Sequence, residues 1–250
     1  MKSIRQTLTI KENRQVTDKT WYMRLAGDVS AITAPGQFVN LQIPGKYLRR
    51  PISVHQAIAG AKEISILYDV AGEGTEILTK LGEGRKLDVL VGLGNGFSIP
   101  EEIEHPLLLG GGIGCAPLLQ LGIDLLMAGK KPVAIFGFNT KKDIIPIYKR
   151  MSEIGIPSYI ATVDGSAGTK GFVTDAIAEK NIQYDYFYGC GPTPMLKALC
   201  ELPTPGQLSL ECRMGCGFGV CMCCSLETSG GVKRICKDGP VFDKEDLIWK

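Results

Sequence analysis

The feature that most constrains this chain is a group of cysteines near its C-terminal end. Five of its nine cysteines lie between Cys212 and Cys224. Cys216, Cys221 and Cys224 follow a C-x4-C-x2-C order, and Cys236 supplies a fourth thiol further along. Four thiolates in this order are typical of a plant-type [2Fe–2S] cluster, which exchanges one electron at a time. The spacing therefore predicts an iron–sulfur centre and a role in electron transfer.

A structural zinc ion would also take four cysteine ligands. Zinc sites of this kind usually carry two C-x2-C pairs, whereas only Cys221 and Cys224 form such a pair here. The spacing thus favours iron and sulfide over zinc. Cys212 and Cys223 are further thiols beside the motif, and spacing leaves open an exchange of either one with a ligand.

The composition narrows the class of protein further. The 250 residues carry a net charge of +2, so the chain lacks the basic excess of a nucleic-acid-binding protein. Residues 1–16 contain no apolar run, and we expect no secretory signal. An odd number of cysteines crowded with glycines suits reduced thiols in a cytoplasmic protein.

The first part of the chain reads as short strands separated by Gly, Pro and Asn turns. The expected strands cover residues 5–13, 20–25, 38–43, 52–56, 64–70 and 86–91. Many short strands of even spacing predict an antiparallel β-barrel over residues 1–99.

Strands alternate with helices over residues 100–203. We expect strands at 107–109, 133–136, 158–162 and 184–188, and helices at 118–127, 143–154, 172–180 and 194–201. This alternation predicts a parallel sheet covered on both faces, followed by a cysteine-rich tail over residues 204–250. Residues 106–128 are apolar enough for a membrane span, but glycines and Pro117 divide them, so we expect no contact with a membrane.

Two glycine-rich corners of the α/β lobe are candidate nucleotide sites. The first follows a strand and opens a helix, where bare N–H groups suit a pyrophosphate; it holds Gly111, Gly112, Ile113 and Gly114. The second ends a later strand, where open α/β sheets bind ligands; it holds Cys190, Gly191 and Pro192. Either corner is also compatible with a plain strand-to-helix turn.

Two turns of the barrel region are candidate phosphate contacts. The first places an arginine fork and a hydroxyl at the start of a strand, in Arg50, Pro51, Ile52 and Ser53. The second turn holds Gly74 and Thr75. Each pattern alone is equally compatible with an ordinary solvated turn. Lys141 and Lys142 could receive a 2′-phosphate or be solvated, which leaves NADP open beside NAD.

Together these segments resemble the ferredoxin reductase superfamily, in which an FAD-binding barrel precedes a nicotinamide-nucleotide lobe. Within it, the chain is similar to the electron-transfer subunits of heteromeric, NAD-linked dihydroorotate dehydrogenases. The most specific likeness lies in residues 213–217 and 236–242.

The resemblance implies a place for each cofactor. FAD would contact Arg50, Pro51, Ile52, Ser53, Leu67, Tyr68, Asp69, Gly74 and Thr75. NAD would lie between Gly111, Gly112, Ile113, Gly114, Cys190, Gly191 and Pro192. The [2Fe–2S] cluster would be held by Cys216, Cys221, Cys224 and Cys236.

The resemblance also implies the reaction and the partner. An FMN-containing catalytic subunit would oxidise dihydroorotate, because this chain has no room for a (β/α)8 barrel as well. Electrons would then pass through the cluster and FAD to NAD+, in pyrimidine biosynthesis, within a heterotetramer of two plus two subunits. No acid–base residue is expected, since His55 and His105 stand in no catalytic pattern.

Two other functions stay open. One is a ferredoxin:NAD(P) reductase-like protein, or the flavin subunit of a sulfhydrogenase or sulfite reductase. The other is a redox sensor without enzymatic activity, whose exposed cysteines act as the switch. A sensor does not need two nucleotide sites, so the sequence favours electron transfer.

Overall fold

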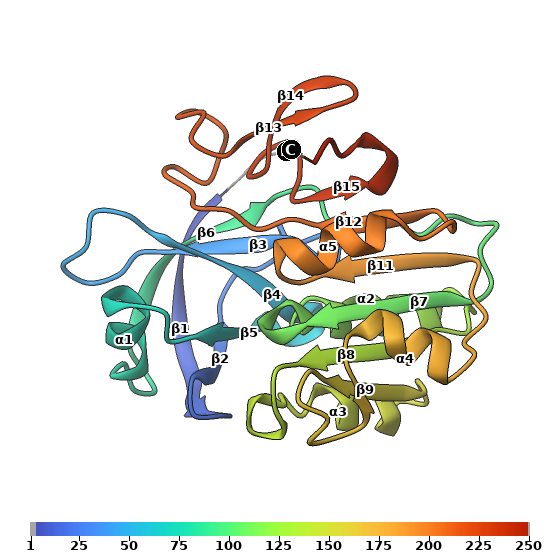
Figure 1. Cartoon of the computed structure of the whole chain (residues 1–250). Helices are drawn as coiled ribbons and strands as arrows, with labels where there is room; N and C mark the ends of the chain where they lie inside the picture. The colour runs from blue at the N-terminus through green and yellow to red at the C-terminus, as the bar shows by residue number, and fades with distance from the viewer. Residues whose placement is uncertain (1–3, 250) are drawn as a thin grey trace.

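The computed structural model describes residues 4–249 of the chain. An N-terminal barrel lies beside an α/β lobe, and the cysteine-rich tail crosses one end of both (Figure 1). The expected fold class, a β-barrel plus a parallel α/β lobe, is confirmed. No helix within residues 4–249 is both long and apolar enough to cross a membrane.

Six antiparallel strands close the barrel in the order β1, β2, β5, β4, β3, β6. Their bounds are β1 (Ile4–Gln15), β2 (Thr20–Ala26), β3 (Phe38–Leu41), β4 (Arg50–Ile58), β5 (Glu63–Asp69) and β6 (Lys86–Leu93). All six predicted strands are present, and β4 begins early enough to include Arg50 and Pro51.

Side chains alternate between the two faces of each barrel strand. On β3, Val39 and Leu41 point into the barrel core, where both are fully buried. Phe38 and Asn40 point the other way and are buried against the rest of the chain. One face of β3 therefore builds the barrel, while the other supports the tail.

A short helix, α1 (Glu73–Thr79), connects β5 to β6 and was not predicted. Its first turn contains Gly74 and Thr75, for which the sequence indicates only a turn. The Thr75 hydroxyl accepts hydrogen bonds from the N–H groups of Ala71 at 2.9 Å and Gly72 at 3.2 Å. A seven-residue helix with glycine at its second position carries too little periodicity to be predicted from sequence.

The α/β lobe contains a seven-stranded sheet in the order β10, β9, β8, β7, β11, β12, β15. Its strands are β7 (Pro106–Gly111), β8 (Val133–Phe138), β9 (Ser158–Thr162), β10 (Thr169–Lys170), β11 (Tyr186–Cys190), β12 (Gly206–Ser209) and β15 (Val241–Asp243). All neighbours run parallel except β12 and β15. Because β8 and β11 lie on opposite sides of β7, the chain reverses direction across the sheet at β7.

Four helices cover the two faces of this sheet: α2 (Leu118–Met127), α3 (Ile147–Glu153), α4 (Val173–Glu179) and α5 (Thr193–Cys200). Residues of α2 and α3 pack with Leu108 and Phe136, and those of α4 and α5 pack with Leu107 and Leu109. Both faces are thus covered, as predicted. The helix expected from residue 143 starts at Ile147, because Pro146 restricts the residue before it.

The tail is not a separate layer. Its strands β12 and β15 extend the sheet of the lobe, and a hairpin of β13 (Ser225–Thr228) and β14 (Gly231–Arg234) projects from the rest (Figure 1). The sheet of the lobe continues past residue 204, so residues 204–250 are not a separate structural unit. That these residues form a separate functional unit remains a proposal.

His55 joins the barrel to the lobe. It is buried on β4, and its Nδ1–H donates a hydrogen bond of 2.6 Å to the carbonyl oxygen of Ala116, just before α2. The Tyr22 ring meets the imidazole edge-on, with ring centroids 6.5 Å apart. Burial lowers the pKa of His55 to about 4, although the hydrogen bond to Ala116 opposes this effect. His55 is therefore a neutral core residue.

This burial predicts that stability depends on pH. The pKa of His55 is about 4 in the folded chain and 6.5 in the ordinary reference state, so the unfolded chain binds the proton first. Stability should therefore fall as the pH drops from about 6.5 to about 4, by up to about 3 kcal/mol. Urea unfolding across this range measures the loss.

The variant His55→Asn, which retains a donor near Ala116, should lose this part of the pH dependence. The matched control His105→Asn changes an exposed histidine and should keep the wild-type slope. A wild-type slope in His55→Asn would contradict the assignment.

Candidate cofactor and cluster sites

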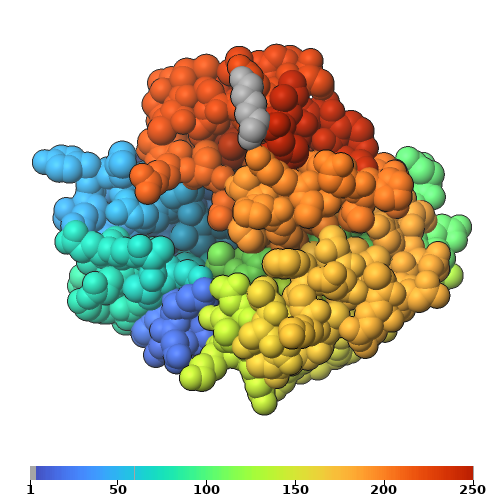
Figure 2. Space-filling model, in the orientation of Figure 1, coloured from blue at the N-terminus to red at the C-terminus, as the bar shows by residue number. Residues whose placement is uncertain are grey.

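A cavity of about 640 Å³ lies where the barrel, the lobe and the tail meet. Figure 2 shows a hollow between the blue and cyan barrel and the orange part of the chain. The barrel contributes Pro51, Ile52, Ser53, Leu67, Tyr68 and Asp69; the lobe contributes Gly111, Gly112, Ile113, Gly114, Cys190, Gly191 and Pro192. Both sets of candidate residues thus contribute to one cavity, although Arg50, Gly74 and Thr75 are not among the residues that line it.

Three candidate residues, Arg50, Gly74 and Thr75, lie together beside this cavity. A Cβ atom on Gly74 would stand 2.5 to 2.7 Å from the guanidinium of Arg50, so the arginine rests directly on the first turn of α1. A side chain at position 74 would displace the guanidinium of Arg50 from this position. The cradle fits an anion that is held by an arginine and a helix start.

The neighbouring Arg49 has a structural role instead. Its guanidinium donates to the Asp88 carboxylate at 2.7 Å and to the carbonyl oxygens of Asn40 and Asp88 at 3.2 and 3.1 Å. These contacts tie β3 to β6. Of the two adjacent arginines, Arg50 is therefore the one placed for a ligand.

The two glycine corners of the lobe touch each other at the carboxyl ends of β7 and β11. A Cβ atom on Gly114 would lie 2.5 Å from the carbonyl oxygen of Cys190, and one on Gly191 would lie 3.1 Å from Gly111. Such close approach leaves bare backbone at the point where the strand order reverses, which is where open sheets bind dinucleotides. The corners therefore fit a nucleotide better than a plain turn.

Two charged residues of the cavity wall, Lys19 and Glu211, were not predicted from the sequence. Lys19 forms an ion pair of 3.6 Å with Asp69, whose carboxylate also accepts a 2.6 Å hydrogen bond from the Thr20 hydroxyl. Glu211 lines the cavity just after β12, and partial burial, reinforced by Asp69, raises its pKa. Glu211 reaches the cavity wall because β12 pairs in parallel with β11, a long-range pairing that the sequence does not reveal.

The cavity also contains Cys190, and Cys115 lies nearby in the core. Burial raises the pKa of Cys190 to about 12, against a hydrogen bond with Ser209, and burial also raises the pKa of Cys115. Both residues are therefore protonated thiols. Cys115 is fully buried, as expected of a small apolar residue, whereas Cys200 is half-buried and accepts a 2.9 Å hydrogen bond from the Trp249 indole.

The first two candidate cluster ligands form one pair. The Cys216 N–H donates to the Cys221 sulfur at 3.4 Å, and the Cys216 sulfur accepts from the N–H groups of Phe218, Val220 and Cys221 at 3.5, 3.3 and 3.5 Å. Burial opposes ionisation of Cys216, but these backbone hydrogen bonds outweigh it and lower its pKa to about 6. The backbone N–H groups of residues 218–221 therefore favour the thiolate form of Cys216.

The other two candidate ligands form a second pair. The Cys236 N–H donates to the Cys224 sulfur at 3.4 Å, and both side chains are buried. A [2Fe–2S] cluster has two irons, and four thiolates supply two to each. Two cysteine pairs therefore fit such a cluster. Within residues 4–249, no three His, Cys, Asp or Glu side chains gather closely enough for a single metal ion.

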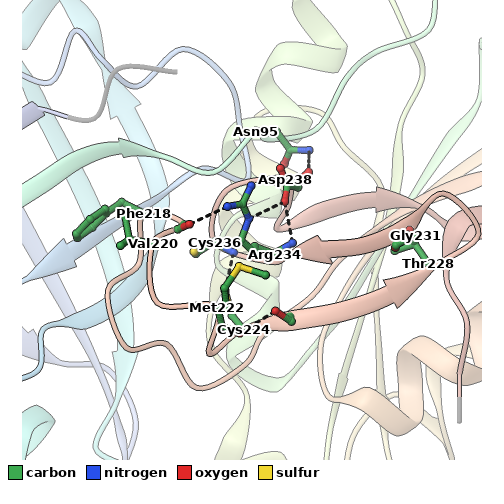
Figure 3. A network of polar contacts seen from close by, with 12 residues as sticks. Asn95, Phe218, Val220, Met222, Cys224, Thr228, Gly231, Arg234, Cys236 and Asp238 are labelled. Atoms are coloured by element: carbon green, nitrogen blue, oxygen red, sulfur yellow. Dashed lines mark hydrogen bonds and ion pairs between the residues drawn. The ribbon is translucent and has the colours of Figure 1, made fainter.

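Arg234 supports the loop that carries these cysteines (Figure 3). Its guanidinium donates to the carbonyl oxygen of Gly219 at 2.8 Å and to the Asp238 carboxylate at 3.2 Å. The Asp238 carbonyl in turn accepts a 3.2 Å hydrogen bond from the Asn95 amide of the barrel region. The loop is therefore held from the hairpin and, through Asn95, from the barrel.

The barrel also contacts the loop directly. The Asn40 amide of β3 donates to the carbonyl oxygen of Cys216 at 3.1 Å, and a Cβ atom on Gly217 would stand 2.4 Å from that amide nitrogen. Glycine at 217, with φ of 79°, lets the loop lie against β3. The first cysteine pair is thereby fixed to the barrel wall.

Solved structures with the same fold define the class of protein. A chain of an NADH-dependent reduced ferredoxin-NADP oxidoreductase aligns with a TM-score of 0.88 and 31% identity, over 97% of this chain and 90% of that one. A ferredoxin NADP+ reductase from Neisseria gonorrhoeae shares the fold, with a TM-score of 0.65 and 18% identity over 77% and 87% of the two chains. The barrel, the lobe and their shared cavity are those of a ferredoxin reductase-like oxidoreductase.

Relatives narrow this class to one family. The iron-sulfur cluster binding domain of dihydroorotate dehydrogenase B matches residues 211–248. The dihydroorotate dehydrogenase B (NAD(+)) electron transfer subunits of Bacillus velezensis and Fusobacterium nucleatum are each 40% identical, over 96% of this chain and 97% and 96% of theirs. The chain belongs to the family of dihydroorotate dehydrogenase B electron transfer subunits.

The contact between the glycine corners predicts a stability effect. The variant Gly114→Ala places a methyl group against the backbone of Cys190 and should destabilise the chain by about 1–3 kcal/mol. Gly82→Ala is the matched control, because a Cβ atom at Gly82 meets nothing within 4 Å. Urea unfolding compares the two variants, and an equal effect of both would contradict the close approach.

Proposed function

We propose that this chain carries electrons from a dihydroorotate-oxidising, FMN-containing partner subunit, through a [2Fe–2S] cluster and FAD, to NAD+. The observation that carries this proposal is that Phe38, which lines a cavity walled by both the barrel and the glycine corners of the lobe, belongs to one packed apolar cluster with Cys224 and Cys236. When bound, FAD exchanges electron pairs with NAD and single electrons with the cluster.

The residues of the chain position these groups. Arg50, together with Gly74 and Thr75, holds the FAD diphosphate, while Ser53 and the segment from Leu67 to Asp69 hold the flavin. Cys216, Cys221, Cys224 and Cys236 ligate the cluster, and the glycine corners receive the phosphates of NAD. The lining of the cavity, the contact of Arg50 with Gly74, the touching glycine corners and the two cysteine pairs support these roles.

NAD, not NADP, is the proposed nucleotide. Within the described part of the chain, Asp143 lines the cavity, whereas Lys141 and Lys142 lie outside its wall. A carboxylate at this position suits a free 2′-hydroxyl and repels a 2′-phosphate. The backbone N–H of Lys141 donates to the Ser166 hydroxyl at 2.7 Å. The family name, which specifies NAD(+), agrees with this reading.

The partner docks on the cluster loop in this proposal. Three large apolar side chains of this loop are exposed: Phe218 at 45%, Val220 at 73% and Met222 at 51%. They flank Cys221, itself exposed, so a partner seated on them would come close to the cluster. Exposed apolar side chains that gather in this way mark protein interfaces. We place the complex in the cytoplasm, as a heterotetramer of two plus two subunits.

One assay tests the division of labour. The isolated chain, loaded with FAD and cluster, should oxidise NADH with an artificial electron acceptor but should not oxidise dihydroorotate. Adding the cognate catalytic subunit should start NAD+ reduction by dihydroorotate, because only that subunit contains the oxidising site. Dihydroorotate turnover by the isolated chain would contradict the proposal. Failure of the loaded chain to oxidise NADH would contradict it as well.

A second experiment tests the docking surface. The variant Val220→Asp places a charge among exposed apolar side chains and should weaken binding of the catalytic subunit at least about tenfold. Its iron content should equal that of wild type, because Val220 contributes only a backbone N–H to the cluster loop. Calorimetric titration of one subunit with the other gives the affinity.

Met127→Asp is the matched control for Val220→Asp. Met127 is also an exposed apolar residue, at 83%, but it lies at the end of α2 in the lobe. Unchanged affinity is expected for this variant. Equal weakening by both substitutions, or none by Val220→Asp, would place the interface elsewhere.

A further inference from the structure

One face of the β3–β4 pair carries both proposed sites. Phe38 lies opposite Ser53 in the register of these strands, and paired side chains share a face. In the same register Asn40 lies opposite Pro51. Phe38, Pro51 and Ser53 line the cavity proposed for the flavin. The amide of Asn40 instead donates to the carbonyl oxygen of Cys216 at 3.1 Å. Asn40 is therefore the residue at which this face passes from the flavin site to the cluster loop.

The backbone of Asn40 is held from both sides. Asn40 pairs with Leu90 of β6 as well as with Pro51 of β4. Its carbonyl oxygen also accepts a 3.2 Å hydrogen bond from the Arg49 guanidinium, and the residue is only 1% exposed. A residue held in this way has little freedom to move with the loop. The position of the loop therefore depends on Asn40, and not the reverse.

The side chain of Asn40 is only half satisfied. Its nitrogen, Nδ2, donates to Cys216, but its oxygen, Oδ1, is buried and has no hydrogen-bond partner within the described residues. An unpaired buried acceptor costs at least as much free energy as one such hydrogen bond contributes. An apolar side chain of the same shape would thus serve the stability of the barrel equally well. Buried groups that break this rule call for an explanation, which functional sites often provide.

The contact fixes one peptide group of the loop. The peptide unit after Cys216 is planar, so the amide of Asn40 sets the direction of the whole unit when it holds the carbonyl. The next residues direct three N–H groups at the Cys216 sulfur, from Phe218, Val220 and Cys221. A shift of this peptide would therefore change three hydrogen bonds to a single candidate ligand.

Other polar contacts of the loop come from elsewhere in the chain. Arg234, which donates to the carbonyl oxygen of Gly219, belongs to the hairpin (Figure 3). Asn95 follows β6 and contacts the segment that returns to the sheet. Among the described side chains of β1 to β6, only Asn40 is hydrogen-bonded to residues 212–224. The first half of the loop thus depends on one amide for its place against the barrel.

We propose that Asn40 is a positioning residue for the iron–sulfur cluster. Its amide fixes the Cys216 peptide to the wall that also bears the flavin cavity, and so directs the N–H groups of the loop at the Cys216 sulfur. Hydrogen bonds to ligand sulfurs stabilise the more negative, reduced cluster, and groups that orient the ligands strengthen metal binding. The inference rests on the proposed function and assigns a role to a residue outside the ligand set.

Iron release tests this role in the full chain. Asn40→Leu keeps the size of the side chain but removes both polar atoms. With the cluster loaded, this variant should release iron to a chelator about tenfold faster than wild type, as expected when a group that orients a ligand is lost. Redox titration followed by electron paramagnetic resonance should give a lower cluster potential. Asn40→Gln, which keeps an amide donor, should release iron more slowly than Asn40→Leu.

Stability separates this role from a structural one. Before the cluster is loaded, the full chain of Asn40→Leu should unfold at the same urea concentration as wild type or at a higher one. The reason is that the substitution removes the unpaired Oδ1 together with the hydrogen bond to Cys216. A residue that only supported the fold would lower the urea midpoint when replaced.

Asn13→Leu is the matched control, because it makes the same change on β1. The Asn13 amide donates to the carbonyl oxygens of Leu78 and Leu81, both at 2.9 Å, and accepts from the Tyr68 hydroxyl at 3.0 Å. Since each polar atom of this side chain is paired, Asn13→Leu should unfold at a lower urea concentration than wild type. Its rate of iron release should equal that of wild type.

Three results would overturn the inference: a wild-type rate of iron release and potential in Asn40→Leu, equally fast release in Asn13→Leu, or a urea midpoint of Asn40→Leu below that of wild type. The last result would make Asn40 a structural residue. A wild-type chain that takes up no iron and sulfide would instead count against the proposed function. The two failures are therefore distinguishable.

Discussion

The antiparallel pairing of β12 with β15 determines where the cysteine loop lies. The chain leaves the sheet after Ser209 and returns at Val241, and the Leu210 N–H donates to the Pro240 carbonyl at 2.9 Å. Both ends of the loop are thereby fixed to the edge of the lobe. The Asn95 amide then links the returning segment to the barrel, through the carbonyl oxygens of Val241 at 2.8 Å and Asp238 at 3.2 Å. Without this closure, the cysteine pairs would have no fixed position relative to the cavity.

Glycines make the other junctions possible, because each junction brings backbone closer than a side chain allows. Gly114 meets the backbone of Cys190, Gly74 lies under Arg50, and Gly217 lies against Asn40. A Cβ atom at any of these positions would stand 2.7 Å or less from its neighbour. The same small residues that join the parts of the chain also expose backbone N–H groups beside the proposed ligands. Assembly and binding therefore depend on the same positions.

The sequence predicted those features of the site whose signal lies in neighbouring residues. The order of Cys216, Cys221 and Cys224 and the glycine corner before α2 depend on near neighbours, and both could be read directly. Glu211 and the strand β15 could not, because their roles arise from the pairing of segments far apart in the chain. The α1 helix was missed for a different reason, since its seven residues begin with Glu73 and Gly74 and show no clear period. Residue roles in the flavin and NAD sites remain proposals.

The cysteines show how local surroundings divide one residue type into different roles. Cys216 is surrounded by backbone N–H donors, which offset the effect of burial and favour the thiolate. Burial raises the pKa of Cys212 to about 12, with Cys224 and Cys223 adding to the effect, so its proton is retained. A thiolate can ligate iron, whereas a thiol beside a ligand can only donate a hydrogen bond to it. Burial also raises the pKa of Cys236 to about 12, although Cys236 is a candidate ligand, so iron would have to displace its proton. The proposed ligand set therefore rests on the spacing of the motif and on the two backbone-linked cysteine pairs, not on pKa values alone.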